Sequence, residues 1–256
     1  GRKPILPANG GWQTVAPSAI RLHDEAPAPR ELTSAEIVAI VKNFADAAHR
    51  AKRVGIDALE LHAAHGYLLH QFLSPISNLR TDGYGGSLDN RMRFTLEVFE
   101  ATRSAWPSNK PLGIRLSATD WVDGGWDIEQ SIVLCNLLQE SGCDWIDVSS
   151  GGLSQDQVVP IGPGYQVHLS ERIRQETGLA TIAVGMITEP RQAEIIVSEG
   201  KADMVALARG MLYDPRWVWH AADELGGRAE YPVRYRRCRP SQRDDVFGER
   251  DTGSTN

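Results

Sequence analysis

Short strand-like segments alternate with amphipathic helical segments along most of this 256-residue sequence. The strand-like segments are short and apolar or of alternating polarity, and each ends in polar or glycine-rich residues. An order of strand then helix, repeated with short links, is typical of parallel strands joined by right-handed crossovers. The order predicts an α/β fold, as in a TIM (β/α)8 barrel, although five such strands cannot close a barrel of eight.

The segments can be placed on the sequence from their periodicity and capping residues. Strands are predicted over residues 57–62, 111–117, 145–150, 180–185 and 203–209. Helices are predicted over residues 33–53, 88–105, 127–141, 169–176, 189–199 and 214–225. Residues 1–30 are predicted to form a surface loop, and residues 71–90 a long loop of the kind that is often functional.

Composition excludes several classes of protein. The net charge is -6, and no basic stripe precedes the C-terminal tail, so a nucleic-acid binder is not expected. No apolar run has membrane-spanning length, and no segment resembles a signal peptide, so no membrane partner is expected. The three cysteines fit no zinc or iron–sulfur spacing and suggest a reducing compartment, which we predict to be the cytoplasm.

The end of the first predicted strand carries candidate site residues. Alternation places Glu60 and His62 on the face opposite Leu59 and Leu61, and a barrel would turn that face inward. His65 and Tyr67 follow directly. Two imidazoles and a phenol can donate hydrogen bonds to an oxygen and deliver a proton. Structural or solvated roles are the alternative, but such a group is costly to place without a use.

Two further features belong to the same end of the predicted barrel. Arg115 lies on the inward face of its strand, where a permanently charged guanidinium needs acceptors, supplied by a ligand or by a structural pair with Glu60. The turns containing Gly185 and Arg209 follow the last two strands. Such turns often hold a phosphate through backbone N–H groups. The residues alone thus predict a barrel enzyme for a phosphorylated ligand.

Several longer motifs resemble one known family. They are His62-Ala-Ala-His-Gly-Tyr67, Phe72-Leu-Ser-Pro75, Asn78 with Arg80-Thr-Asp82, Tyr84-Gly-Gly-Ser87, Asn90-Arg91 and Val184-Gly-Met-Ile187. Together with Ala208-Arg209, they resemble the Old Yellow Enzyme family over residues 1–237. The paired histidines and Pro232-Val-Arg-Tyr235 resemble its thermophilic-like branch of FMN-dependent ene-reductases.

The resemblance implies a function and roles. NAD(P)H would reduce FMN, and hydride would pass from the flavin to the β-carbon of an activated alkene such as an enone, enal or nitroalkene. His62 and His65 would hold the alkene's oxygen, and Tyr67 would protonate the α-carbon. The flavin would be held by residues after several strands: Arg115, Gly185, Ala208 and Arg209. Arg237 would reach the site of a neighbouring subunit in a homo-oligomer.

The sequence also departs from the family pattern. Ala208 stands where the branch usually has glycine, a mild change if only the backbone N–H is used. The family's first three strands would precede Gly1, so residues 1–237 are predicted to be a partial barrel and residues 238–256 a disordered tail. A non-catalytic product that binds a phosphorylated ligand or a complementing chain is therefore the alternative. A metal-dependent lyase or hydrolase is a weaker one, because no third ligand joins His62 and His65.

Overall fold

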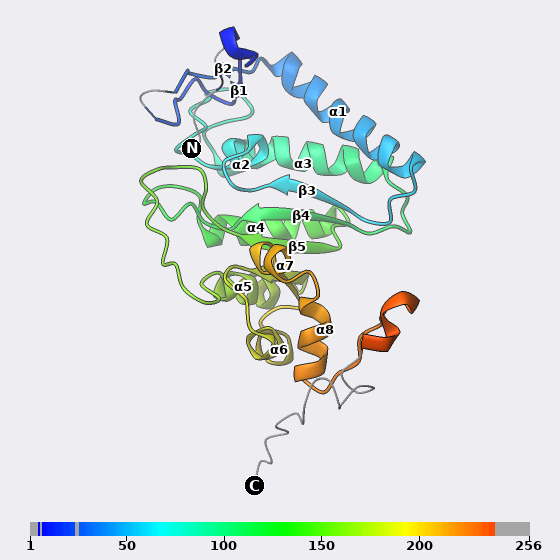
Figure 1. Ribbon diagram of the computed structural model, residues 1–256. Coiled ribbons are helices and arrows are strands. Elements are labelled where there is room, and N and C mark those ends of the chain that lie inside the picture. The colour runs from blue at the N-terminus through cyan, green and yellow to red at the C-terminus, as the bar shows by residue number, and fades with distance from the viewer. Residues whose placement is uncertain (1–4, 6, 24–25, 239–256) are drawn as a thin grey trace.

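A five-stranded parallel sheet forms the centre of the computed structural model, which describes residues 5, 7–23 and 26–238 (Figure 1). Its strands are β3 (Leu59–Ala63), β4 (Leu112–Ser117), β5 (Trp145–Ser149), β6 (Ala180–Val184) and β7 (Met204–Ala206). Each strand pairs with the one before it, in the order β3-β4-β5-β6-β7. This order confirms the predicted parallel strands and is that of consecutive units in a TIM barrel.

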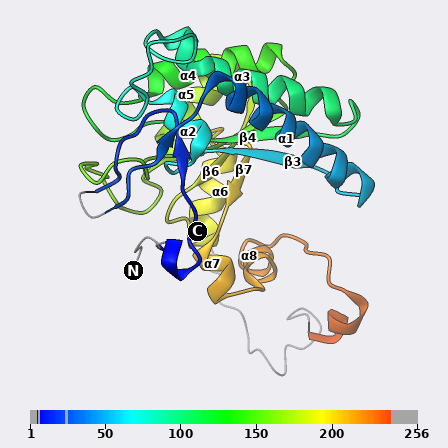
Figure 2. The ribbon, with the colours of Figure 1, turned by 90° about the horizontal axis from the view of Figure 1, so that it is seen from above.

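Helices alternate with the strands as predicted. They are α1 (Ser34–Arg53), α3 (Leu88–Ala105), α4 (Ile128–Glu140), α5 (Val167–Thr177), α6 (Pro190–Ser198) and α8 (Trp217–Glu224). Thr33 and Glu36 form the predicted capping box at the start of α1. Helices α1 and α3 pack against each other, and α1, α3 and α4 lie on one side of the strands (Figure 2).

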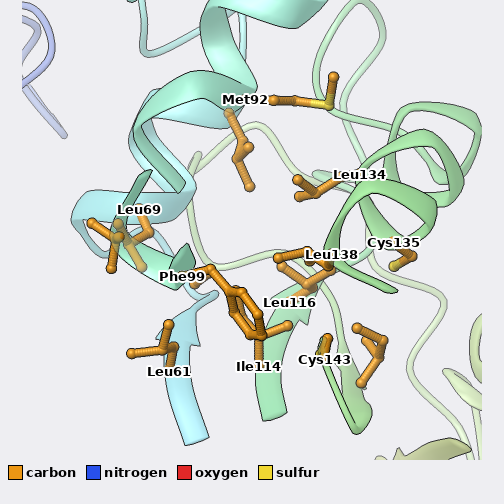
Figure 3. Close-up of a cluster of buried hydrophobic side chains, with 14 of the residues drawn as sticks. Leu61, Leu69, Met92, Phe99, Ile114, Leu116, Leu134, Cys135, Leu138 and Cys143 are labelled. Carbon is orange, nitrogen blue, oxygen red and sulfur yellow. The ribbon is translucent and has the colours of Figure 1, made fainter. Parts of the chain in front are cut away.

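The two faces of the sheet differ in composition, as alternation requires. Leu61, Ile114 and Leu116 point to the helix side and are buried with Phe99 and Leu138 in one hydrophobic cluster (Figure 3). The opposite face carries polar residues. Glu60 and His62 are exposed on it, so they lie on the face opposite the leucines, as alternation predicted.

An indole crosses the polar face of the sheet near the start of β4. The Trp145 Nε1–H donates to a Glu60 carboxylate oxygen at 2.9 Å. The ring passes directly over Gly113, where a Cβ would overlap it. Glycine at this position is therefore required by packing.

Gly113→Ala should destabilise the protein by about 1–3 kcal/mol, the usual cost of overpacking. The methyl group would displace the Trp145 ring and break its bond to Glu60. Thermal unfolding measures the change. Gly83→Ala is the matched control because a Cβ at Gly83 meets nothing within 4 Å. Equal melting temperatures for the two variants would contradict this packing.

Several boundaries differ from the sequence-based predictions. The first loop contains η1 (Pro7–Asn9) and two short paired strands, β1 (Val15–Ala16) and β2 (Arg30–Glu31). The helix α2 (Leu68–Leu73) overlaps the start of the predicted long loop. The last strand ends at Ala206, and Arg209 instead begins α7 (Arg209–Tyr213). Elements this short contain too few residues to show a hydrophobic periodicity in the sequence.

The C-terminal part extends beyond the sheet. The 3-10 helix η2 (Val233–Cys238) includes the first residue of the predicted disordered tail, and the rest of that tail lies outside the described residues. Within the part of the chain that is described, no helix combines the length and apolar character needed to cross a membrane.

Candidate active site

The strand register brings His62 and Arg115 together at the carboxyl end of the sheet. His62 on β3 is the direct partner of Arg115 on β4, and Arg115 is the partner of Asp147 on β5. The His62 ring centroid lies 5.2 Å from that of His65 and 5.2 Å from that of Tyr67. The three predicted substrate-binding rings therefore form one cluster beside the guanidinium.

Serines at the ends of β4 and β5 hold His65. Its backbone N–H donates to Ser117 Oγ at 2.9 Å, and its Nε2 lies 2.6 Å from Ser149 Oγ. Ser117 Oγ–H in turn donates to the Gly151 carbonyl at 2.9 Å. Gly152 lies so close that a Cβ on it would come within 2.7 Å of the His65 Cα. The loop after β5 is thus packed against the turn of residues 65–67, which we call the histidine turn.

A large open cavity borders this cluster. Its volume is about 1030 Å³, and His65, Gly66 and Tyr67 form part of its wall. Apolar side chains of Ile20 and Leu153 line it as well. Tyr67 is 63% exposed, so its hydroxyl can meet a molecule that enters from this side.

Arg115 is paired with Asp147, and the alternative pairing with Glu60 is wrong. Arg115 Nε lies 3.4 Å from Asp147 Oδ2, whereas Glu60 accepts a hydrogen bond from Trp145. Arg115 Nε and Asp147 Oδ1 are buried, and neither has a hydrogen-bond partner among the described residues. The Arg115 side chain is nonetheless 27% exposed, so the guanidinium suits a ligand that carries carbonyl oxygens or ring nitrogens.

Burial shifts the pKa values of two groups on this face. It raises the pKa of Asp147 to about 6, an effect opposed by Arg115 and strengthened by Glu60. Burial and the neighbouring Arg115 both lower the pKa of His62. His62 is therefore a neutral imidazole at pH 7, and its N–H group can serve as a hydrogen-bond donor.

Asp147→Asn tests this electrostatic assignment. The folded pKa of Asp147 lies above the ordinary value of 3.8, so its contribution to stability is present below that value and is lost as pH rises through about 6. Relative to wild type, the variant should gain about 2 kcal/mol in free energy of unfolding between pH 4.5 and pH 7. Urea unfolding at both pH values measures this gain. Asp123→Asn, at an exposed position, should show no such gain. If the free energy of unfolding of Asp147→Asn also differs from that of wild type by the same amount at both pH values, the assignment is contradicted.

The predicted phosphate turns also lie at the carboxyl end of the sheet. Gly185 has a φ of +119°, and its carbonyl accepts from the Gly164 N–H at 3.0 Å. The buried Gln166 donates to the Val184 carbonyl at 2.8 Å and accepts from Ser150 Oγ–H. The loop after β5 thus supports the turn after β6. Ala208 and Arg209 follow the adjacent strand β7, and both are exposed.

Arg237 is the one predicted site residue that lies away from the others. It is exposed within η2, which lies beyond α8 and away from β3 (Figure 1). Its reach into a neighbouring subunit stays a prediction.

Sequence reasoning missed His70 and Asp120. Both are fully buried, and His70 Nε2 lies 2.8 Å from Asp120 Oδ1. His70 lies between the motifs of residues 62–67 and 72–75, which is the one signal that could have suggested it. No group of three or more His, Cys, Asp or Glu residues within the described chain could hold a metal ion.

Comparisons with known proteins find similar sequences and structures. A family model described as "NADH:flavin oxidoreductase / NADH oxidase family" matches residues 10–227. An NADPH dehydrogenase of Geobacillus thermodenitrificans is 44% identical over 237 residues, which are 93% of this chain and 68% of that protein. These matches cover the histidine cluster, Arg115 and both predicted phosphate turns.

Solved structures show the same arrangement of strands and helices. A 2-naphthoyl-CoA reductase in complex with 2-naphthoyl-CoA aligns with a TM-score of 0.77 and 28% identity. The alignment covers 85% of this chain and 34% of that one. A morphinone reductase in complex with tetrahydroNAD aligns with a TM-score of 0.69 and 30% identity, over 87% of this chain and 62% of that one. The partial TIM barrel predicted from the sequence is confirmed.

Proposed function

Because this chain belongs to the NADH:flavin oxidoreductase / NADH oxidase family, the family of the Old Yellow Enzymes, we propose that it reduces activated alkenes with electrons from NAD(P)H. Membership confirms the expected class of enzyme and the expected cofactors, FMN and NAD(P)H. It does not favour the alternative of a non-catalytic product.

The residues at the carboxyl end of the sheet fit FMN. The partly exposed guanidinium of Arg115 can donate to acceptor atoms of the ring, and the exposed Arg209 adds positive charge beside the Gly185 turn. We assign the phosphate to Gly185, Ala208 and Arg209, because backbone N–H groups and a guanidinium are the donors that phosphate prefers. When bound, FMN would supply the hydride-transfer chemistry.

The histidine cluster fits the oxygen of an enone or nitroalkene. Hydride arriving at the β-carbon moves an electron pair onto that oxygen, and N–H donors from His62 and His65 stabilise the resulting negative charge. The neutral His62 donates a hydrogen bond to this oxygen and keeps its own proton. Tyr67 O–H gives its proton to the α-carbon and regains one from water, so one hydride and one proton add across the double bond.

The observation that carries this proposal is the direct register of His62 with Arg115, with the phosphate turns on the same end of the sheet. The test is NADPH oxidation by the purified protein with cyclohexenone, followed by identification of cyclohexanone. Formation of cyclohexanone in step with NADPH loss is expected. NADPH loss that is the same with and without the enone, and yields no cyclohexanone, would reject activated alkenes as substrates.

Two further expectations accompany this function. We propose a homo-oligomer in which Arg237 lies near a neighbouring site, supported by its exposure in η2. We also expect the enzyme to work in the cytoplasm. Cys135 and Cys143 are buried free thiols, as is usual in a reducing compartment.

A further inference from the structure

A buried polar network lies directly behind the histidine turn. His70 is on α2, and Asp120 is in the loop after β4. Both side chains are completely buried, as is Ser74. Asp120 accepts hydrogen bonds from His70 at 2.8 Å, from Ser74 Oγ–H at 2.6 Å and from the Trp126 N–H at 2.7 Å. A carboxylate this deep is retained only where its acceptors are satisfied, and here both oxygens are.

The other side of the His70 ring faces the site. The backbone N–H of Gly66 donates to His70 Nδ1 at 2.9 Å. Because Nδ1 accepts, it carries no proton, and the ring proton must be on Nε2, where it is donated to Asp120. The two bonds together form one chain: Gly66 N–H to His70, and His70 to Asp120.

Gly66 is the residue between the substrate-binding His65 and Tyr67. The turn is strained at His65, whose φ of 58° lies in the left-handed region, whereas glycine adopts the φ of 76° at Gly66 without strain. Such a conformation persists only where its surroundings impose it. Ser117, Ser149 and Gly152 fix the turn on the His65 side, and His70 fixes the peptide that joins His65 to Gly66.

We propose that His70 and Asp120 are positioning residues that set the placement of His65 and Tyr67 through the Gly66 peptide. They act through hydrogen bonds to the backbone and do not touch substrate. This inference rests on the proposed function, since it assigns the turn they hold to substrate binding. It adds that the third histidine of the segment 62–70 is part of the site although it is wholly buried.

Two substitutions separate the two bonds of His70. Asn at position 70 places an acceptor near Nδ1 and keeps the Gly66 bond, whereas Gln places a donor near Nε2 and keeps the Asp120 bond. His70→Gln should raise the KM for cyclohexenone at least about tenfold and shift the His65 ring resonances, because the turn is released. His70→Asn should stay within about threefold of wild type in KM, even though it leaves Asp120 one donor short and melts at a lower temperature.

If His70 had only a structural role, the two variants would differ in KM in another order. The KM would then follow the melting temperature, with both variants equally affected or His70→Asn more affected, and that result would overturn the proposal. Rate and KM are measured together with thermal unfolding, so that loss of fold is seen directly.

Wild-type protein gives a test that needs no substitution. Long-range 15N–1H spectra of the histidine rings should show His70 with its proton on Nε2 and an unprotonated Nδ1 at pH 7. A proton on Nδ1 would overturn the proposal even if neither variant folds. These spectra need no flavin or substrate, so failure of cyclohexenone reduction with a correct His70 tautomer would count against the proposed function and not against the hydrogen-bonded chain.

Discussion

Replacing both His62 and His65 by alanine is expected to lower kcat/KM for cyclohexenone by at least about a hundredfold. The two imidazoles lie 5.2 Å apart by ring centroids, beside Arg115, and are the N–H donors proposed for the developing negative charge. Removing even one such donor typically costs a factor of about 10²–10³ in rate. Steady-state NADPH oxidation with the enone measures the effect.

The control is His49→Ala, which removes an exposed histidine on α1, on the helix side of the sheet. It should leave kcat/KM unchanged. If the double variant keeps full activity while remaining folded, the roles assigned to His62 and His65 are wrong.

Arg209→Ala should weaken FMN binding by about 10- to 100-fold. Arg209 follows β7 directly and is exposed at the end of the sheet where the Gly185 turn also lies. A hydrogen bond between charged partners contributes about 1.5–3 kcal/mol, which corresponds to this range of affinity. Flavin fluorescence during titration of apoprotein gives the dissociation constant.

A second arginine provides the matched control. Arg191 lies on α6 with its side chain 76% exposed, and its carboxylate partner is Glu224. Arg191→Ala should bind FMN as wild type does. Equal weakening by both substitutions would point to a general effect of net charge, and no weakening by Arg209→Ala would remove it from the phosphate site.

The strands of the sheet could be predicted from the sequence because burial of one face places apolar residues at every second position of a strand. Leu61 and Ile114 point to the helices, while His62 and Arg115 point away from them, as alternation alone requires. The sequence also predicted the shared end of the sheet for the histidine cluster and the phosphate turns, since parallel strands all end on one side. Short elements such as α2 and β1 carry no comparable period and were missed.

The hydrogen-bond partners were beyond sequence reasoning. Asp147 as the partner of Arg115 depends on the register of β4 with β5, which no local pattern specifies. Asp120 meets His70 across 50 positions in the chain, and only the packed fold brings them together. An isolated aspartate after a strand has many possible roles, and its burial decides among them.

The central claim is that the carboxyl end of β3 to β7 binds FMN, with the phosphate at the turns of Gly185 and Arg209. The most direct measurement compares FMN with riboflavin, which lacks the phosphate, in fluorescence titrations of the folded apoprotein. We expect saturable binding of one FMN per chain and binding of riboflavin that is at least about tenfold weaker. A folded protein that leaves FMN fluorescence unchanged, or binds riboflavin as tightly as FMN, would contradict the account.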